Sequence, residues 1–248
     1  MKFVDEVSPE KLRGGFYTPP QLVAECFGRV AELLGNDRAL DILEPSAGDG
    51  AFVRGVSPAV RGALIRKPRF TCVEILHEEA AKCRDALRSA HLKGEVIDGS
   101  FFSWARGQLP SFDALVGNPP FVRYQFVPRS QRDDANWIFG GRGQVLDGVA
   151  NLWIPFLLIS LELLRSQGAF AMVLPSELFA TKSAGVVRSE LIRHIDDLQI
   201  DLHPRGSFPR ILQDTIVLSG RRCEVTGTER VVKFVEHSRR LRPFERNL

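Results

Sequence analysis

The chain has 248 residues, of which 44% are hydrophobic and 25% are charged, and its net charge at pH 7 is +3. This length fits one large α/β domain with a packed core, and the apolar fraction argues against a disordered chain. No run of about 18 apolar residues could span a membrane, and the mixed-charge first 15 residues lack the apolar segment of a signal peptide.

The predicted elements alternate between strands and helices along the chain. The expected strands are Ala39–Leu43, Phe70–Glu74, Glu95–Ile97, Phe112–Val116, Ala169–Leu174, Leu198–Leu202 and Thr215–Leu218, with a further short one at Val231–Val235. The expected helices are Pro20–Leu34, Ala51–Val60, His77–Ala90, Leu152–Leu164 and Ser176–Ile195. Such alternation predicts a mostly parallel sheet covered by helices on both faces, with ligands bound beyond the carboxyl ends of the strands.

Two stretches do not follow this pattern. Residues 1–15 are expected to be a loose lead-in, and Val122–Gly148 is long, polar and rich in arginine and glycine. A loop of that length is usually a functional lid or a binding loop, so we expect it to be mobile and to become ordered on nucleic acid.

The cysteine and arginine residues give weaker indications. Cys26, Cys72, Cys83 and Cys223 lack CxxC spacing, which favours reduced thiols in a cytoplasmic protein over a metal site or disulfides. The arginines cluster within residues 123–142 and 239–242, which is typical of a solvated face or of a surface that meets an anionic partner.

The turn after the first predicted strand reads ILEPSAGDGAFV, residues 42–53. Gly48 and Gly50 permit a tight turn and a close approach of the backbone to a ligand. Val53 stands where the dinucleotide fingerprint requires a third glycine, and the carboxylate of Glu44 would repel phosphate. The turn therefore favours a cofactor that has a cationic end and no phosphate.

The second predicted strand ends at Glu74. A carboxylate at this position can accept hydrogen bonds from both hydroxyls of a ribose. The alternative is an acid that only begins the helix near His77.

These motifs, together with NPPF at Asn118–Phe121 and FYTPPQLVAECF at Phe16–Phe27, resemble those of class I S-adenosylmethionine-dependent methyltransferases. Their order is similar to that of the DNA adenine-N6 methyltransferases of restriction–modification type, from about Gly15 to Gly220. The resemblance implies a Rossmann-like α/β fold with a seven-stranded sheet, a catalytic domain at residues 16–220, and S-adenosylmethionine as cofactor. It also implies methylation of the N6 amino group of adenine in DNA, as part of a restriction–modification or phage-defence system.

The resemblance assigns cofactor binding to the YTP segment, the glycine turn and the ends of the next strands. These residues are Tyr17, Thr18, Pro19, Glu44, Pro45, Ser46, Ala47, Gly48, Gly50, Glu74, Ile75, Ser100, Phe101 and Asn118. The family usually reads Gly-Asp-Phe after the third strand, where this chain has Gly99-Ser100-Phe101. Ser100 forms a weaker hydrogen bond than the usual acid, unless Asp98 compensates, so we expect weaker cofactor binding.

The catalytic residues that the resemblance implies are Asn118, Pro119, Pro120, Phe121 and Phe208. The Asn118 side-chain oxygen and the Pro119 carbonyl would accept the two hydrogens of the adenine amine and aim its lone pair at the methyl group. The prolines keep this segment extended and prevent a helix from consuming the carbonyl. Phe121 and Phe208 would hold the flipped base of a DNA duplex between them.

Several alternatives remain open. The substrate could be an RNA adenine or a protein glutamine side chain, or the chain could be a non-catalytic subunit that keeps the fold and binds DNA or a partner. Residues 221–248 offer only an extra strand and an arginine-rich tail. A target-recognition domain is therefore expected to be missing, and a specificity subunit or a C-terminal continuation would supply it. Without either, DNA binding should be weak, dependent on salt and poor in sequence preference.

Overall fold

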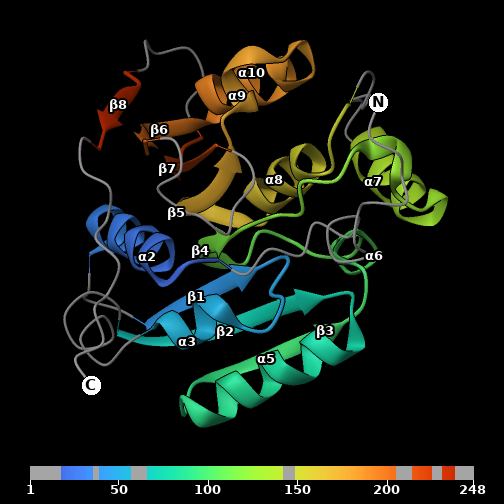
Figure 1. The fold of residues 1–248 in the computed structure, drawn as a ribbon, viewed down its shortest axis with the longest axis vertical. Coiled ribbons are helices and arrows are strands. Elements are labelled where there is room, and N and C mark those ends of the chain that lie inside the picture. The colour runs from blue at the N-terminus through green and yellow to red at the C-terminus, as the bar shows by residue number, and fades with distance from the viewer. Residues whose placement is uncertain are drawn as a thin grey trace.

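The structure, a computed structural model, describes residues 18–35, 39–56, 66–141, 149–204, 214–224 and 231–237. In these residues one mixed sheet has the order β3-β2-β1-β4-β5-β7-β6-β8 (Figure 1). Its strands are β1 (Ala39–Glu44), β2 (Arg66–Glu74), β3 (Lys93–Asp98), β4 (Phe112–Gly117), β5 (Leu164–Pro175), β6 (Ile195–Leu202), β7 (Thr215–Arg222) and β8 (Lys233–Glu236). The predicted α/β fold is confirmed, and β8, at the place of the further short strand, makes the sheet eight-stranded rather than seven-stranded.

The sheet is parallel except at β7, which runs antiparallel to β5 and to β6. Strands β2 and β3 follow β1 toward one side, whereas the chain returns to pair β4 with the other side of β1. The strand order therefore reverses between β1 and β4. Such a reversal opens a crevice at the carboxyl ends of the two strands, which is where this class of sheet binds its ligands.

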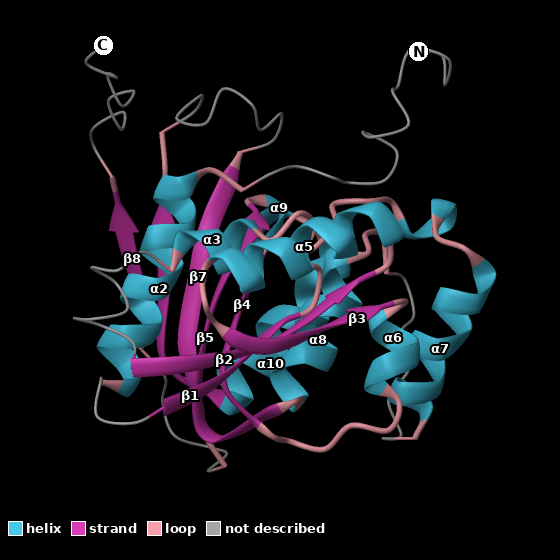
Figure 2. Ribbon diagram, turned by 90° about the horizontal axis from the view of Figure 1, so that it is seen from below, coloured by secondary structure: helices cyan, strands magenta, loops and turns pink. Residues whose placement is uncertain are grey.

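Helices cover both faces of the sheet. One face is covered by α2 (Pro20–Leu34), α3 (Ala51–Gly55) and α5 (His77–Ser89), and the other by α6 (Phe101–Ala105), α7 (Arg129–Gly140), α8 (Trp153–Glu162), α9 (Glu177–Ala180) and α10 (Gly185–His194). The alternation of side chains along β4 shows the two layers, because Ala114 and Val116 join the α2 side and Leu115 joins the α8 side. Figure 2 shows β8 and α7 at opposite ends of the molecule.

Helix α2 has the predicted bounds, and its sequence explains them. Proline at the first helical position suits a helix start, and Leu22, Cys26 and Val30 are buried at a spacing of four residues. The helix ends at Leu34. The next residue, Gly35, has a φ of +70°, which few residues other than glycine adopt. Residues Thr18 and Pro19, just before the helix, are thereby placed near the carboxyl end of β4.

The predicted helix Ser176–Ile195 is wrong as a single element. The structure has α9, a short 3₁₀ turn at Lys182–Ala184 and then α10, because Thr181 adopts an extended conformation with ψ of 143°. The Arg188 guanidinium donates to the carbonyls of Leu178 and Thr181 at 2.7 and 3.1 Å, which satisfies acceptors that the break leaves unpaired. The first predicted helix after β1 is also shorter than expected, since α3 ends at Gly55.

The prediction that Val122–Gly148 is a loop is wrong over Arg129–Gly140, which forms α7, whereas its mobility and its ordering on nucleic acid stay predictions. Ala135, Ile138 and Phe139 of this helix are buried in the core at the i, i+3, i+4 spacing of an amphipathic helix. The high content of polar residues concealed this short apolar face. Residues 142–148 lie outside the described residues.

Two further observations concern the whole described chain. No helix among the described residues is both long and apolar enough to cross a membrane. All four cysteines are buried free thiols, so no disulfide joins them.

Candidate active site at the carboxyl ends of the strands

Parallel pairing brings the ends of four strands to one edge of the sheet. Glu74 at the end of β2 is opposite Asp98 of β3, and Leu43 of β1 is opposite Leu115 of β4. The predicted site residues that follow these strands therefore lie along one edge, as the sequence implied. Thr18, which precedes α2, lies at the same edge of the sheet.

The turn after β1 is fastened to both neighbouring strands. The Ala47 amide donates to the Val73 carbonyl at 3.0 Å, and the Ser46 hydroxyl donates to the Asn118 carbonyl at 3.2 Å. Ser46 and Ala47 thus align the turn with the ends of β2 and β4.

The two glycines of this turn serve different purposes. Gly50, with φ of +84°, lies so close to α5 that a Cβ atom would stand 3.1 Å from the Cys83 Cα atom. Gly48 also has a positive φ, of +54°, but no atom of the described residues lies within 4 Å of the position its Cβ would take. Gly50 is therefore needed for packing, whereas Gly48 leaves open space beside the turn for a ligand.

Glu74 is oriented by two backbone amides. One carboxylate oxygen accepts from the Gly48 amide and the other from the Leu76 amide, each at 2.8 Å. Each oxygen keeps capacity for a further donor, so two ligand hydroxyls can still bind. Burial raises the pKa of Glu74 above its ordinary value, and the hydrogen bonds from Leu76 and Gly48 oppose that rise.

Glu44 differs from the expectation of an exposed charge at the strand tip. Its side chain is 1% exposed, and its carboxyl lies 3.7 Å from the Cys72 sulfur, which donates to it. Burial, with the nearby Cys83 as the next cause, raises the pKa of Glu44 well above its usual range. The argument that a Glu44 charge repels phosphate is therefore weakened, because burial favours the uncharged carboxyl.

The residues after β3 form a second part of the edge. The Ser100 hydroxyl oxygen is buried and has no hydrogen-bond partner among the described residues. Phe101 is 3% exposed and stacks on Phe156, with ring centroids 5.0 Å apart, so little of its ring is accessible to a ligand. Ile75, next to Glu74, is 49% exposed and offers an apolar surface beside the carboxylate.

Asp98 does not take the place of the missing acid at position 100. Its carboxylate contacts His77 at 2.6 Å and Arg84 at 3.0 Å, both on α5. Arg84 and His77 lower the pKa of Asp98, so the group is a charged partner of that helix. Asp98 therefore binds α5 and does not supply the acid that Ser100 replaces.

Asn118 is held by the segment that precedes α2. Its amide nitrogen donates to the Thr18 hydroxyl at 3.2 Å, while its side-chain oxygen is buried and has no partner in the described part of the chain. A buried acceptor without a donor is unfavourable by roughly 1–3 kcal/mol unless a ligand completes it, so the Asn118 oxygen is a candidate binding atom at this crevice. The sequence predicts that Thr18 binds the cofactor, which stays a prediction, and the structure shows that its hydroxyl holds the Asn118 side chain.

The backbone after Asn118 is fixed as well. No donor among the described residues bonds the Pro119 carbonyl, and neither proline has an amide hydrogen to form a turn. Beyond Phe121 the chain pairs with residues 150–152, through bonds from Leu152 to Val122 and from Tyr124 to Ala150 at 2.8 and 2.9 Å. Phe121 is half-buried against the core and keeps part of its ring exposed.

Some predicted site residues cannot be placed, and one feature was missed. Tyr17 and Phe208 lie outside the described residues. Sequence reasoning missed the exposed indole of Trp137 on α7, which has the Arg106 guanidinium 4.3 Å from its ring centre. The sequence signal for this contact was an aromatic residue, Trp137, within an arginine-containing stretch. That stretch was predicted to be a loop, so the residue was not considered.

Known proteins resemble this chain in sequence and in fold. Residues 75–200 match the family described as Eco57I restriction-modification methylase. The modification methylase CviBIII of Paramecium bursaria Chlorella virus NC1A is 26% identical over 79% of this chain. The match spans 46% of that relative, so the chain covers less than half of its length.

Two solved structures show the same fold. A class I S-adenosylmethionine-dependent methyltransferase from Listeria monocytogenes superposes with a TM-score of 0.73 at 13% identity, over 93% of this chain and 68% of that one. The methyltransferase subunit of a type I restriction-modification system from Streptococcus thermophilus gives 0.70 at 21% identity, over 89% and 47% of the two chains. With the family match over half of the sequence, these likenesses lead to one conclusion: the chain belongs to the Eco57I restriction-modification methylase family.

Proposed function

We propose that this chain transfers a methyl group from S-adenosylmethionine to the N6 amino group of adenine in DNA. The observation that carries the proposal is the Asn118 side-chain oxygen, a buried acceptor that has no partner among the described residues beside the crevice between β1 and β4. Its amide nitrogen is occupied by Thr18, so the side chain presents the oxygen and not the nitrogen to a ligand. An acceptor in this position is suited to an amine that carries hydrogens.

The fold and the family imply S-adenosylmethionine as the cofactor, and the residues at the strand ends fit it. Gly48 leaves open space beside the turn, and Glu74 can accept from two ribose hydroxyls. The buried Ser100 oxygen without a partner can bond an adenine amine at the other end of the same edge. When bound, the cofactor would supply an electrophilic methyl group.

The chain's own residues would prepare the substrate amine. The lone pair of an aromatic amine is delocalised into the ring, which makes the amine a weak nucleophile. The Asn118 oxygen and the Pro119 carbonyl would each accept one of its hydrogens and turn the lone pair out of the ring plane. The same two carbonyl dipoles would stabilise the positive charge that develops on the nitrogen during transfer.

The base would be held by aromatic faces. Adenine in a duplex must leave the stack before its amine can reach Asn118. Phe121 follows directly after the two prolines and has an exposed part of its ring, so it can stack on the extruded base. Phe208 remains the predicted second face.

DNA as the substrate is supported by the family and by charge. Arg123 is exposed two residues after Phe121, so a cationic group adjoins the proposed base pocket, and Arg129 is exposed further along the chain at the start of α7. Phosphate contacts of this kind position a duplex but do not specify a sequence. A specificity subunit or a recognition domain therefore stays part of the proposal, together with the restriction–modification setting.

The proposal is tested by incubating the chain with radiolabelled S-adenosylmethionine and separate pools of duplex DNA, RNA and protein at low salt. Label in DNA, lost in the Asn118→Ala variant, is the expected result. Label in RNA or in protein glutamine would redirect the substrate assignment. Saturable cofactor binding without any transfer would indicate a non-catalytic subunit.

A further inference from the structure

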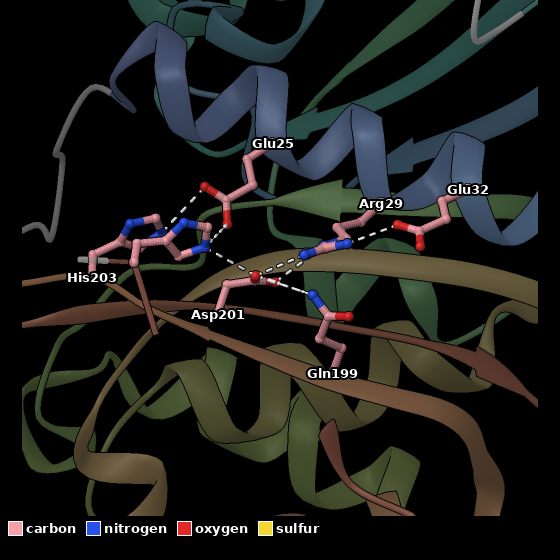
Figure 3. A network of polar contacts seen from close by, with 7 residues as sticks. Glu25, Arg29, Glu32, Gln199, Asp201 and His203 are labelled. Carbon is pink, nitrogen blue, oxygen red and sulfur yellow. Dashed lines mark hydrogen bonds and ion pairs between the residues drawn. The ribbon is translucent and has the colours of Figure 1, made fainter. Parts of the chain in front are cut away.

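A second polar cluster lies between α2 and the carboxyl ends of β6 and β8 (Figure 3). Glu25 and Arg29 come from α2, and Asp201 comes from β6. His203 follows the end of β6, and His237 follows the end of β8. Three elements that are distant in sequence thus meet at this cluster.

The two histidines converge on one carboxylate. The His203 Nε2 atom is 3.2 Å from one Glu25 oxygen, and the His237 Nε2 atom is 3.8 Å from the other. The two imidazole rings are parallel within 10°, with centroids 4.7 Å apart. Glu25, His203 and His237 each present one ligand atom, and these atoms lie within 4.8 Å of one another.

This arrangement approaches the dimensions of a metal site. Zinc binds histidine nitrogen and carboxylate oxygen at about 2.0–2.2 Å, which makes the edge of its tetrahedron roughly 3.4 Å long. The 3.2 Å contact of His203 is close to that edge, whereas the 3.8 Å contact of His237 is made to the other Glu25 oxygen. Because the two rings are stacked and parallel, one of them must turn for both nitrogens to meet one cation. We propose that Glu25, His203 and His237 form a binding site for a divalent transition-metal cation such as Zn²⁺.

The donor set selects the class of cation. Two imidazole nitrogens and one carboxylate suit Zn²⁺ and its transition-metal neighbours, whereas Mg²⁺ and Ca²⁺ prefer ligands that are all oxygen. The side chain of His203 is 4% exposed and that of His237 is 37% exposed, so a cation can enter from the His237 side. The fourth position would face the same side and hold a water molecule.

Asp201 lies beside the site and contacts the same His237 nitrogen that would bind the cation. Its carboxylate is fully buried, and its Oδ1 atom is 3.1 Å from the His237 Nε2 atom. Arg29 donates to both of its oxygens at 2.8 and 3.1 Å, and Gln199 donates to both at 3.0 Å. Asp201 is therefore rigidly held, and a cation would replace its contact with the His237 Nε2 atom while its negative charge stays nearby.

Binding of a cation at this site would connect the edge strand β8 to α2. Strand β8 pairs only with β6 in the described sheet, and most of its side chains are exposed. A cation bound by His237 and Glu25 would join the end of β8 to α2 directly. The ligands are at positions 25, 203 and 237, so no short spacing motif could have revealed them.

The test is titration of the full chain, after treatment with a chelator, with Zn²⁺, Mg²⁺ and Ca²⁺ by calorimetry. We expect one Zn²⁺ per chain, a rise in the thermal midpoint with Zn²⁺, and no saturable binding of Mg²⁺ or Ca²⁺. His237→Ala and Glu25→Gln should each weaken Zn²⁺ binding by more than the roughly 10–100-fold that loss of an outer-shell partner causes. His237 is partly exposed and Glu25→Gln is isosteric, so both variants should keep the wild-type circular dichroism spectrum.

His194→Ala is the matched control, because His194 faces a single carboxylate, Glu190, at 3.4 Å and has no second histidine. Its Zn²⁺ affinity should equal that of the wild type. The absorption spectrum with Co²⁺ separates this site from the buried thiols, since thiolate ligands add a charge-transfer band. Absence of saturable Zn²⁺ binding, equal affinity in His237→Ala, or a thiolate band would each overturn the proposal.

Discussion

The two edges of the sheet treat their buried polar groups differently. At the amino edge, the buried Asp113 of β4 accepts from the Asp41 amide at 2.9 Å and pairs with Arg165 at 2.8 Å. At the carboxyl edge of the same strand, the Asn118 oxygen is buried without a partner among the described residues, and the Ser100 oxygen after β3 is in the same condition. The buried carboxylate at the amino edge thus has an amide and an ion-pair partner, whereas these two acceptors at the carboxyl edge have none in the described part of the chain.

This difference separates residues that hold the fold from residues that serve the site. Pairing buried polar groups stabilises a protein, and leaving them unpaired is unfavourable. A ligand can complete such groups where they line a crevice. Mutations at the amino edge should therefore change stability, and mutations at the carboxyl edge should change binding and catalysis.

Asn118→Ala should have the largest effect. The loss of one stabilising contact to the developing charge should lower the rate of methyl transfer by about 10²–10³-fold, by analogy with the loss of an oxyanion-hole donor. The affinity for S-adenosylmethionine should change little, because the proposed partner of the Asn118 oxygen is the substrate amine. Single-turnover transfer and calorimetry measure the two quantities.

Asn151→Ala is the control for a structural asparagine, since the Asn151 side chain accepts from the Trp153 amide. It should lower the thermal midpoint while transfer per folded molecule is kept. Transfer near the wild-type rate in Asn118→Ala would contradict the proposed mechanism, and a collapse of cofactor affinity would make Asn118 a structural residue.

Glu74→Gln should weaken cofactor binding by roughly 1–3 kcal/mol, the scale for hydrogen bonds to a charged group. Burial raises the pKa of Glu74, so protonation begins at a higher pH than for an exposed glutamate. The protonated acid accepts less well, and wild-type cofactor affinity should therefore fall as the pH falls through this raised pKa. Calorimetry across pH should show that Glu74→Gln removes this dependence; an unaltered affinity and pH profile would make Glu74 only a helix-start acid.

Asp113→Ala tests the opposite edge. It leaves the Asp41 amide without its acceptor and Arg165 without its buried partner, so the free energy of unfolding should fall by roughly 1–3 kcal/mol. Denaturant titration measures the loss. Cofactor affinity and transfer rate of the folded variant should stay at the wild-type level. A selective loss of transfer would contradict the expectation that the amino edge affects only stability.

Thr18→Val removes the hydroxyl that bonds the Asn118 amide and keeps the side-chain volume. The net value of such a bond is about 0.5–1.5 kcal/mol, so transfer should slow by up to about tenfold. Because the effect acts through the orientation of Asn118, the double variant with Asn118→Ala should be no slower than Asn118→Ala alone. Additive losses in this double-mutant cycle would separate Thr18 from Asn118.

Ser100→Asp should have the smallest effect and the opposite sign. A carboxylate forms a stronger bond to an amine than a hydroxyl does, so cofactor binding should tighten if Ser100 lies in the adenine pocket. Calorimetry with S-adenosylmethionine measures the change. Unaltered or weaker binding would show that Ser100 does not lie in the adenine pocket.

Much of this arrangement could be predicted from the sequence because local signals and long-range packing agreed. Helix α2 begins at a proline and carries a regular apolar face, and Glu74 and Asn118 end buried strands. The glycine turn was recognised by its residues, but the open side of Gly48 and the packed side of Gly50 depend on α5. Those roles require tertiary structure.

Other features could not be predicted, for specific physical reasons. The apolar face of α7 is only three buried residues wide within a polar stretch, so the segment was interpreted as a loop. The break at Thr181 depends on Arg188, which donates from the next helix. The burial of Glu44 depends on which side of β1 its side chain takes, and a glutamate at a strand end gives no sign of that.

The central claim is that the carboxyl edge binds an exocyclic amine of a DNA base. Its most direct test is mass spectrometry of nucleosides from DNA incubated with S-adenosylmethionine and either the wild type or Asn118→Ala. We predict N6-methyladenine with the wild type and none above background with the variant. Methyl groups found on carbon 5 of cytosine, or equal N6-methyladenine with both proteins, would contradict the account.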